Sequence, residues 1–173
     1  MEDIYIDRPY YFTNIYLLKR ILYRNLISIS ELTNFDVNRV NHLLSIIKSI
    51  KLDRIVWSLN HGENLSWNYK LQYGKVYIID WENYSIDIYG KDFLGYVIRN
   101  GLDFELIEDF ILTELGRSNS EKKESLLILI ILMFSAIKDY IKARSVLREK
   151  DIEIINNILE KFCEDNRKSI SIN

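Results

Sequence analysis

The chain has 173 residues, of which 48% are hydrophobic and 28% charged, and this composition suits one globular domain with a sizeable core. The formal net charge of −2 leaves no dominant basic excess, which argues against a nucleic-acid partner. The single cysteine, Cys163, excludes an internal disulfide, and no Cys/His spacing is typical of a zinc site. We expect a cytoplasmic protein in which Cys163 is a small buried apolar residue.

The most apolar run, LLILIILMFSAI at 126–137, is flanked by charged residues on both sides. A membrane-spanning helix needs about 20 apolar residues, so this run is too short. A helix that is apolar all round and this short is typical of a protein core. The N-terminal sequence MEDIYIDRPYYF is acidic and lacks the pattern of a secretory signal. The sequence therefore predicts no membrane span.

Two helices are predicted at the start of the chain, over 11–27 and 34–50, because apolar residues recur there at helical spacing. The candidate N-terminal caps are Thr13 or Asn14 for the first helix and Asn34 or Asp36 for the second. The chain has one proline and six glycines, which favours helices joined by short loops.

The middle of the chain changes character. The stretch DRIVWSL at 53–59 is short and rich in β-forming residues, whereas HGENLSWN at 61–68 is polar and irregular. The stretch NYKLQYGKVYIID, residues 68–80, predicts a strand, a turn at Gly74 and a second strand. A small central hairpin with a polar loop in front of it follows from these patterns.

Helical patterns resume after this hairpin, and Ser120 is a candidate cap in the loop 116–123. The predicted helices cover 92–101, 103–115, 122–145 and 151–166. We therefore expect an α+β protein that is mainly α. Its single domain, 1–173, would consist of leading helices at 1–55, a loop and hairpin at 56–92, and a helical subdomain at 93–173.

The polar residues that suggest chemistry lie in the non-helical centre. Asn68 follows Glu63 by five positions, the spacing that separates the aspartate and asparagine of the protein-kinase pattern H-R-D-x-x-x-x-N. Asp80 ends the second strand of the hairpin, which returns it towards Asn68. Phosphoryl transfer needs such a set, because one carboxylate orients the attacking hydroxyl while an asparagine and a second carboxylate hold magnesium.

These residues resemble a known family. HGENLSWN followed by KVYIIDWENYSIDIYGKDF is similar to the catalytic segment of the aminoglycoside phosphotransferase and choline kinase group, and within it to members from bacterial surface-polysaccharide gene clusters. The resemblance covers about 35 residues, Leu59 to Leu94. It implies the C-terminal lobe of a kinase-like fold. The 60 residues before His61 predict helices, so the N-terminal, nucleotide-clamping lobe of that family is missing from this pattern.

The resemblance also implies an activity, the transfer of phosphate from ATP to a small hydroxylated molecule such as a sugar or polysaccharide precursor. Glu63 would take the place of the catalytic base, and Asn68 and Asp80 would bind Mg²⁺ and, through it, ATP. His61 would support catalysis by bracing the loop through hydrogen bonds.

Two acidic residues would support this site according to the same resemblance. Asp92 matches an aspartate that begins a helix in the family and would be structural. Glu82 would be a supporting or substrate-facing group without a certain role.

Two departures from the family pattern leave alternatives open. The family carries aspartate where this chain has Glu63, and one added methylene moves a carboxylate by roughly 1 Å, which can cost about a hundredfold in rate. With the missing lobe, this suggests a second hypothesis: a catalytically impaired pseudokinase or half-enzyme that binds a ligand or a partner chain replacing that lobe. A third hypothesis, a helical scaffold with accidental motif matches, predicts that Asn68 and Asp80 do not converge.

Overall fold

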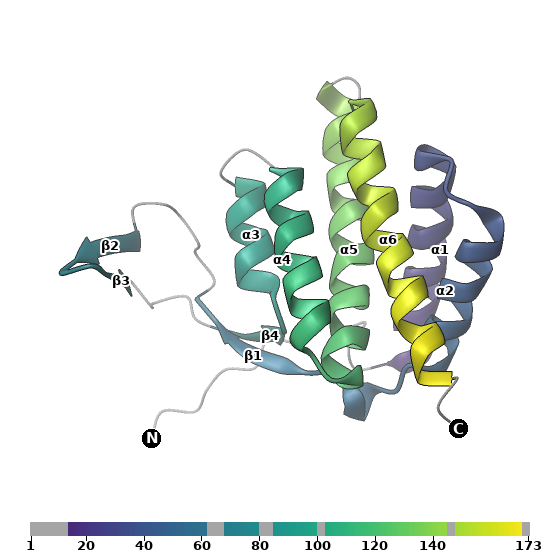
Figure 1. The fold of residues 1–173 in the computed structure, drawn as a ribbon, viewed down its shortest axis with the longest axis horizontal. Coiled ribbons are helices and arrows are strands. Elements are labelled where there is room, and N and C mark those ends of the chain that lie inside the picture. Colours follow the sequence, from purple (N-terminus) through teal and green to yellow (C-terminus); the bar gives the residue numbers. More distant parts are fainter. Residues whose placement is uncertain (1–13, 62–67, 80–84, 100–102, 145–147, 171–173) are drawn as a thin grey trace.

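The computed structural model describes residues 14–61, 68–79, 85–99, 103–144 and 148–170. Within these residues the protein is mainly helical, with two small antiparallel sheets, which confirms the α+β, mainly α expectation (Figure 1). The helices are α1 (Ile15–Thr33), α2 (Val37–Ser49), α3 (Lys91–Arg99), α4 (Phe104–Arg117), α5 (Ser120–Arg144) and α6 (Glu149–Ile170). The strands are β1 (Trp57–Asn60), β2 (Tyr69–Gln72), β3 (Lys75–Ile78) and β4 (Ser85–Ile88), and a 3₁₀ turn, η2 (Leu52–Arg54), precedes β1.

The first two helices begin at polar caps, as the sequence predicts. The Asn14 side chain accepts hydrogen bonds from the main-chain N–H groups of Tyr16 and Leu17, at 3.0 and 3.2 Å. Asp36 caps α2 in the same way through the Arg39 N–H, at 3.0 Å. Each bond satisfies a donor that the first helical turn leaves without a partner inside the helix.

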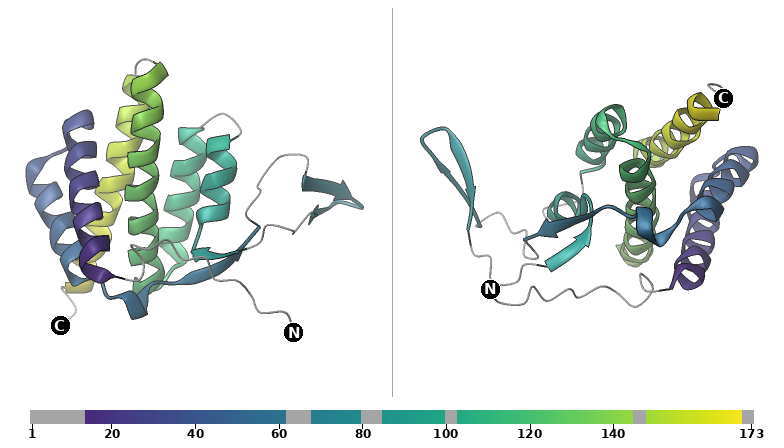
Figure 2. Two further views of the ribbon diagram at one scale, coloured as in Figure 1. Left: turned by 180° about the vertical axis from the view of Figure 1, so that it is seen from behind. Right: turned by 90° about the horizontal axis from the view of Figure 1, so that it is seen from below.

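Helix α5 carries the apolar run into the core. Its residues Leu126 to Ile131 are each no more than 6% exposed, which confirms the expectation of a buried helix. The helix packs against α1, and Figure 2 shows it between the α1–α2 pair and the α3–α4 pair. Among the described residues, no helix combines the length and the apolar character needed to cross a membrane.

The expected cap of this helix, Ser120, is wrong by one residue. Asn119 is the cap, because its side-chain oxygen accepts the Lys122 N–H at 3.0 Å and its carbonyl accepts the Lys123 N–H at 3.1 Å. The Ser120 hydroxyl instead accepts a hydrogen bond from the Arg54 guanidinium at 3.0 Å, which ties the start of α5 to the segment before β1.

Helix α6 closes the other side of the body against α4 and α2. The Asn156 side chain donates to the Thr33 carbonyl at the end of α1, at 3.0 Å, and Glu160 forms an ion pair with Arg39 at 2.6 Å. Cys163 is 2% exposed and lies against the Arg39 carbonyl, which confirms the expectation of a buried cysteine.

The predicted hairpin is present as β2 and β3. They pair antiparallel from Tyr69 opposite Ile78 to Gln72 opposite Lys75. The two turn residues, Tyr73 and Gly74, have φ angles of 51° and 69°, as a type I′ turn requires. The hairpin projects from the helical body (Figure 1).

The second sheet was only half expected. Strand β1 lies in the predicted β-rich stretch, but its antiparallel partner β4 was not predicted. A buried hydroxyl attaches this ribbon to the core, since Ser125 of α5 accepts the Val56 N–H at 2.8 Å and donates to the Glu121 carbonyl at 2.9 Å. Val56 in turn accepts the Tyr89 N–H at 3.0 Å. The ends of β1 and β4 are therefore fixed relative to α5.

Removing a core side chain from α1 should destabilise the protein far more than removing an exposed one. Leu22 is 0% exposed and Ile27 is 43% exposed on the same helix. We expect Leu22→Ala to lower the free energy of unfolding by about 2–5 kcal/mol through lost burial and the cavity left behind. The matched variant Ile27→Ala should cost under about 1 kcal/mol. Urea denaturation of both measures this, and equal losses would contradict the packing described.

Candidate functional site

The candidate site starts where β1 ends. His61 follows Asn60, the last residue of the strand, and is 0% exposed. Its main-chain N–H donates to Oδ2 of Asp92 at 2.6 Å. Hydrogen bonds that an ionised carboxylate accepts are shorter and stronger than neutral ones. Asp92, at the start of α3, thus holds the chain at the entrance to the loop that follows His61.

The His61 ring reaches the base of the hairpin, where β3 ends. Its Nε2 lies 2.7 Å from the Ile79 carbonyl oxygen. A carbonyl only accepts, so Nε2 carries the proton of this bond. The Ile79 N–H donates to the Asn68 carbonyl at 2.9 Å, which continues the β2–β3 ladder by one pair. Residues 61, 68 and 79 are therefore joined by two hydrogen bonds.

The structure describes three of the six predicted site residues and brings them into one neighbourhood. They are His61, Asn68 and Asp92, and Asn68 is 3% exposed. Glu63, Asp80 and Glu82 lie outside the described residues. The described range 68–79 ends immediately before Asp80. The main-chain hydrogen bond between Ile79 and Asn68 therefore joins one predicted metal ligand, Asn68, to the residue that precedes the other, Asp80.

One residue of this neighbourhood was missed by the sequence analysis. Asn60 is 3% exposed, and its side-chain oxygen accepts the main-chain N–H of Asp92 at 3.1 Å. The available signal was its place beside His61, at the end of a β-rich run. Because its partner lies 32 positions away, no local pattern identifies the contact.

The described residues of the candidate site contain only part of a set of metal ligands. Asn68 offers an amide oxygen, a hard donor of the kind that Mg²⁺ prefers. Asp92 already uses its carboxylate on the His61 N–H. Across the described ranges, no group of three or more His, Cys, Asp or Glu side chains is placed to hold a metal. The second metal ligand that the sequence predicts, Asp80, lies outside the described residues.

Two side-chain interactions connect the start of α3 and the residue before Gly90 to β4 and to α4. Asp87 of β4 is 3% exposed and forms an ion pair with Lys91, the first residue of α3. The Tyr89 hydroxyl donates to the Glu114 carboxylate of α4. Burial and this carboxylate raise the pKa of Tyr89 to about 12, because both disfavour the phenolate.

Comparison of the chain with protein-family models, with curated proteins and with solved structures gives no match. We therefore infer the function of the chain from the residues of the candidate site alone.

The raised pKa of Tyr89 predicts a loss of stability in alkali. In the unfolded chain tyrosine ionises near pH 10, whereas folded Tyr89 keeps its proton up to a pKa of about 12. Between these values the unfolded state binds fewer protons, so stability falls as pH rises from about 10 to 12 and is unaffected below. We expect Tyr89→Phe to flatten this part of the profile, measured as the urea midpoint against pH. An unchanged slope would contradict the Tyr89–Glu114 contact.

Proposed function

We propose that the protein is a kinase-like phosphotransferase that uses ATP and Mg²⁺ to phosphorylate a small hydroxylated molecule, with a sugar or polysaccharide precursor as the favoured class. One observation carries the proposal. His61 and Asn68, which open and close the motif HGENLSWN, both bond to Ile79, the residue before Asp80. The Asn68–Ile79 bond follows from the hairpin itself, whereas the His61–Ile79 bond is not required by it and brings the start of the motif to the residue before Asp80.

The chemistry assigned to these residues needs such a meeting. Phosphoryl transfer depends on positioning the reactants and on neutralising the charge of the phosphates, because the protein forms no covalent bond to the transferred phosphate. Asn68 and Asp80 would hold Mg²⁺, which supplies the positive charge that neutralises the nucleotide phosphates. Glu63 would orient the acceptor hydroxyl and take its proton. His61, fixed by Asp92 and Ile79, would hold the loop that carries Glu63.

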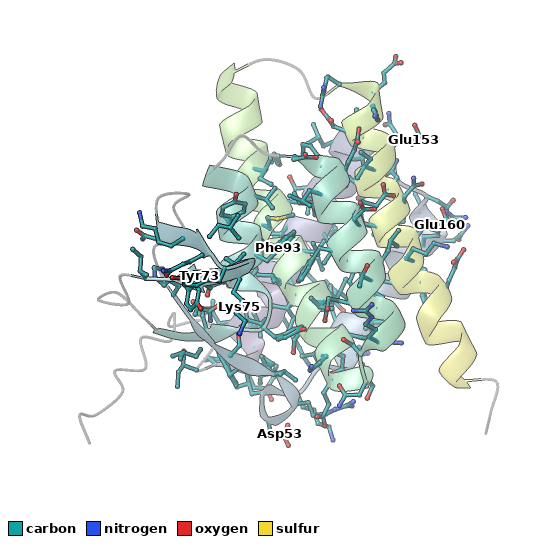
Figure 3. The ribbon with its side chains drawn as sticks, turned by 60° about the vertical axis from the view of Figure 1, so that its left-hand side comes forward. Asp53, Tyr73, Lys75, Phe93, Glu153 and Glu160 are labelled. Atoms are coloured by element: carbon teal, nitrogen blue, oxygen red, sulfur yellow. The ribbon has the colours of Figure 1, made fainter. Side chains whose placement is uncertain are left out.

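The exposed face of the hairpin favours a second function, that of a binding module or half-enzyme. Leu71 and Val76 are opposite each other in the ladder, so they share one face of the hairpin, and they are 77% and 66% exposed. Tyr73 at the turn is 88% exposed, and Figure 3 shows it with Lys75 on the hairpin, away from Glu153 and Glu160 of α6. Clustered exposed apolar side chains mark interaction surfaces. A partner chain that supplies a nucleotide-clamping lobe would cover this one.

Nucleotide binding is tested first, by calorimetric titration of Mg²⁺–ATP into the whole chain. We expect binding that requires magnesium and that weakens at least about tenfold in Asp80→Asn, since the amide keeps the shape of the side chain but removes the charge that holds the metal. Asp53→Asn is the matched control, because Asp53 is exposed in η2 and the charge change is the same.

The outcomes separate the two functions. Loss of binding in Asp80→Asn alone supports the phosphotransferase site and justifies a screen of sugars and amino alcohols as acceptors. Equal binding in both variants would contradict a role for Asp80. No binding by the wild-type chain at millimolar nucleotide would reject an active site in the isolated chain and favour the half-enzyme that needs a partner.

The substitution Glu63→Asp tests the assignment of the base. If Glu63 takes the base position with its carboxylate displaced by roughly 1 Å, the shorter side chain should raise kcat by up to about a hundredfold and leave the Kd of Mg²⁺–ATP unchanged. Steady-state phosphotransfer to an acceptor found in the screen measures this. Glu63→Gln should abolish turnover, and a fully active Glu63→Gln variant would show that another group is the base.

A further inference from the structure

The residue at the N-cap position of helix α3 has no side chain that could accept a hydrogen bond from the first turn. The Leu94 N–H donates to the Gly90 carbonyl at 3.2 Å, so Gly90 occupies the N-cap position and Asp92 is the second helical residue. A glycine is required there, because φ is +89° and an added Cβ would lie 3.1 Å from Cδ2 of Leu129. A residue without a side chain leaves the first-turn N–H groups without the acceptor that a cap normally provides.

Asn60, the last residue of β1, supplies this acceptor. Its Oδ1 accepts the Asp92 N–H at 3.1 Å, which is the contact that an N-cap side chain makes with the second helical residue. Its Nδ2 donates to the Ser58 carbonyl at 2.8 Å. This second bond fixes which way the amide points, because the nitrogen is used on Ser58 and the oxygen faces α3.

The contact is reciprocal. While the Asn60 side chain accepts from the Asp92 main chain, the Asp92 side chain accepts from the main chain of His61, at 2.6 Å. A capping box makes a similar exchange between two residues of one helix turn, whereas here three residues take part. Here it joins the end of β1 to the start of α3. We call the two bonds the Asn60–His61/Asp92 clamp.

We propose that Asn60 is a positioning residue of the candidate site, which acts through Asp92 to fix His61 and thereby the start of the loop 61–68. This role rests on the proposed function. Asn60 is buried, so it acts on a nucleotide or acceptor only through the clamp. Without its oxygen, the start of α3 loses its cap, the Asp92 carboxylate is no longer held against the His61 N–H, and the loop entrance loosens.

Three variants test the clamp in the full chain. Asn60→Leu has a similar size and no acceptor, whereas Asn60→Ala removes the acceptor without adding apolar bulk. Asp36→Ala removes the ordinary cap of α2 and serves as the control for lost stability. We would measure hydrogen exchange of the His61 and Asp92 amides by NMR, thermal unfolding, and the Kd of Mg²⁺–ATP.

We expect Asn60→Leu to speed exchange of both amides at least about tenfold, because opening of the clamp exposes them locally. It should also weaken Mg²⁺–ATP about tenfold, the lower end of what lost support of a metal site costs. Asn60→Ala should speed exchange of both amides in the same way, because it also lacks the acceptor. Asp36→Ala should lower Tm by about 2–4 °C. It should leave the exchange rates of the His61 and Asp92 amides and the Kd of Mg²⁺–ATP unchanged.

The result that overturns the proposal is an Asn60→Leu variant that behaves like Asp36→Ala, with lower Tm but unchanged exchange at His61. If Asn60→Leu does not fold, Asn60→Ala decides the case, since unchanged exchange of the His61 and Asp92 amides in that variant contradicts the clamp. If the wild-type chain binds no nucleotide, the proposed function fails, and the exchange data alone still support or reject the clamp.

Discussion

The burial of His61 is the constraint on which the candidate site depends. His61 is 0% exposed, and two of its hydrogen bonds, one from the ring and one from the main chain, reach distant parts of the chain. The ring contacts Ile79 and the main chain contacts Asp92. Hydrogen bonds in a buried environment of low dielectric constant are also stronger than in water. The same residue therefore joins β1, the hairpin and α3.

The helical body makes this junction rigid. Ser125, in the second turn of α5, holds the residue before β1, so the strand that leads to Asn60 and His61 starts from a fixed point. From the other side, Gly90 packs against Leu129 of the same helix, and α3 starts there. Both ends of the clamp are thus positioned by α5, which explains how a mainly helical protein can hold His61 and Asp92 in a fixed arrangement.

Local patterns in the sequence predicted the helices well, because apolar spacing and caps such as Asn14 and Asp36 act within a few residues. The features missed depend on distant partners. Strand β4 is only four residues long and is defined by its pairing with β1, and Asn60 caps a helix 32 positions further on. The motif HGENLSWN located the site, but the bonds that hold it are not visible in the motif.

The hairpin shows how the two proposed functions could belong to one protein. Its alternating pattern puts Leu71 and Val76 on one face, while Lys70 and Lys75 lie on the other. A two-stranded ribbon is marginally stable by itself, so whatever covers the apolar face also stabilises the hairpin. Because Asn68 and Ile79 form the base of this ribbon, the same occupant would stiffen the place where the metal ligands are expected. Covering the face and completing the nucleotide site would then be one event.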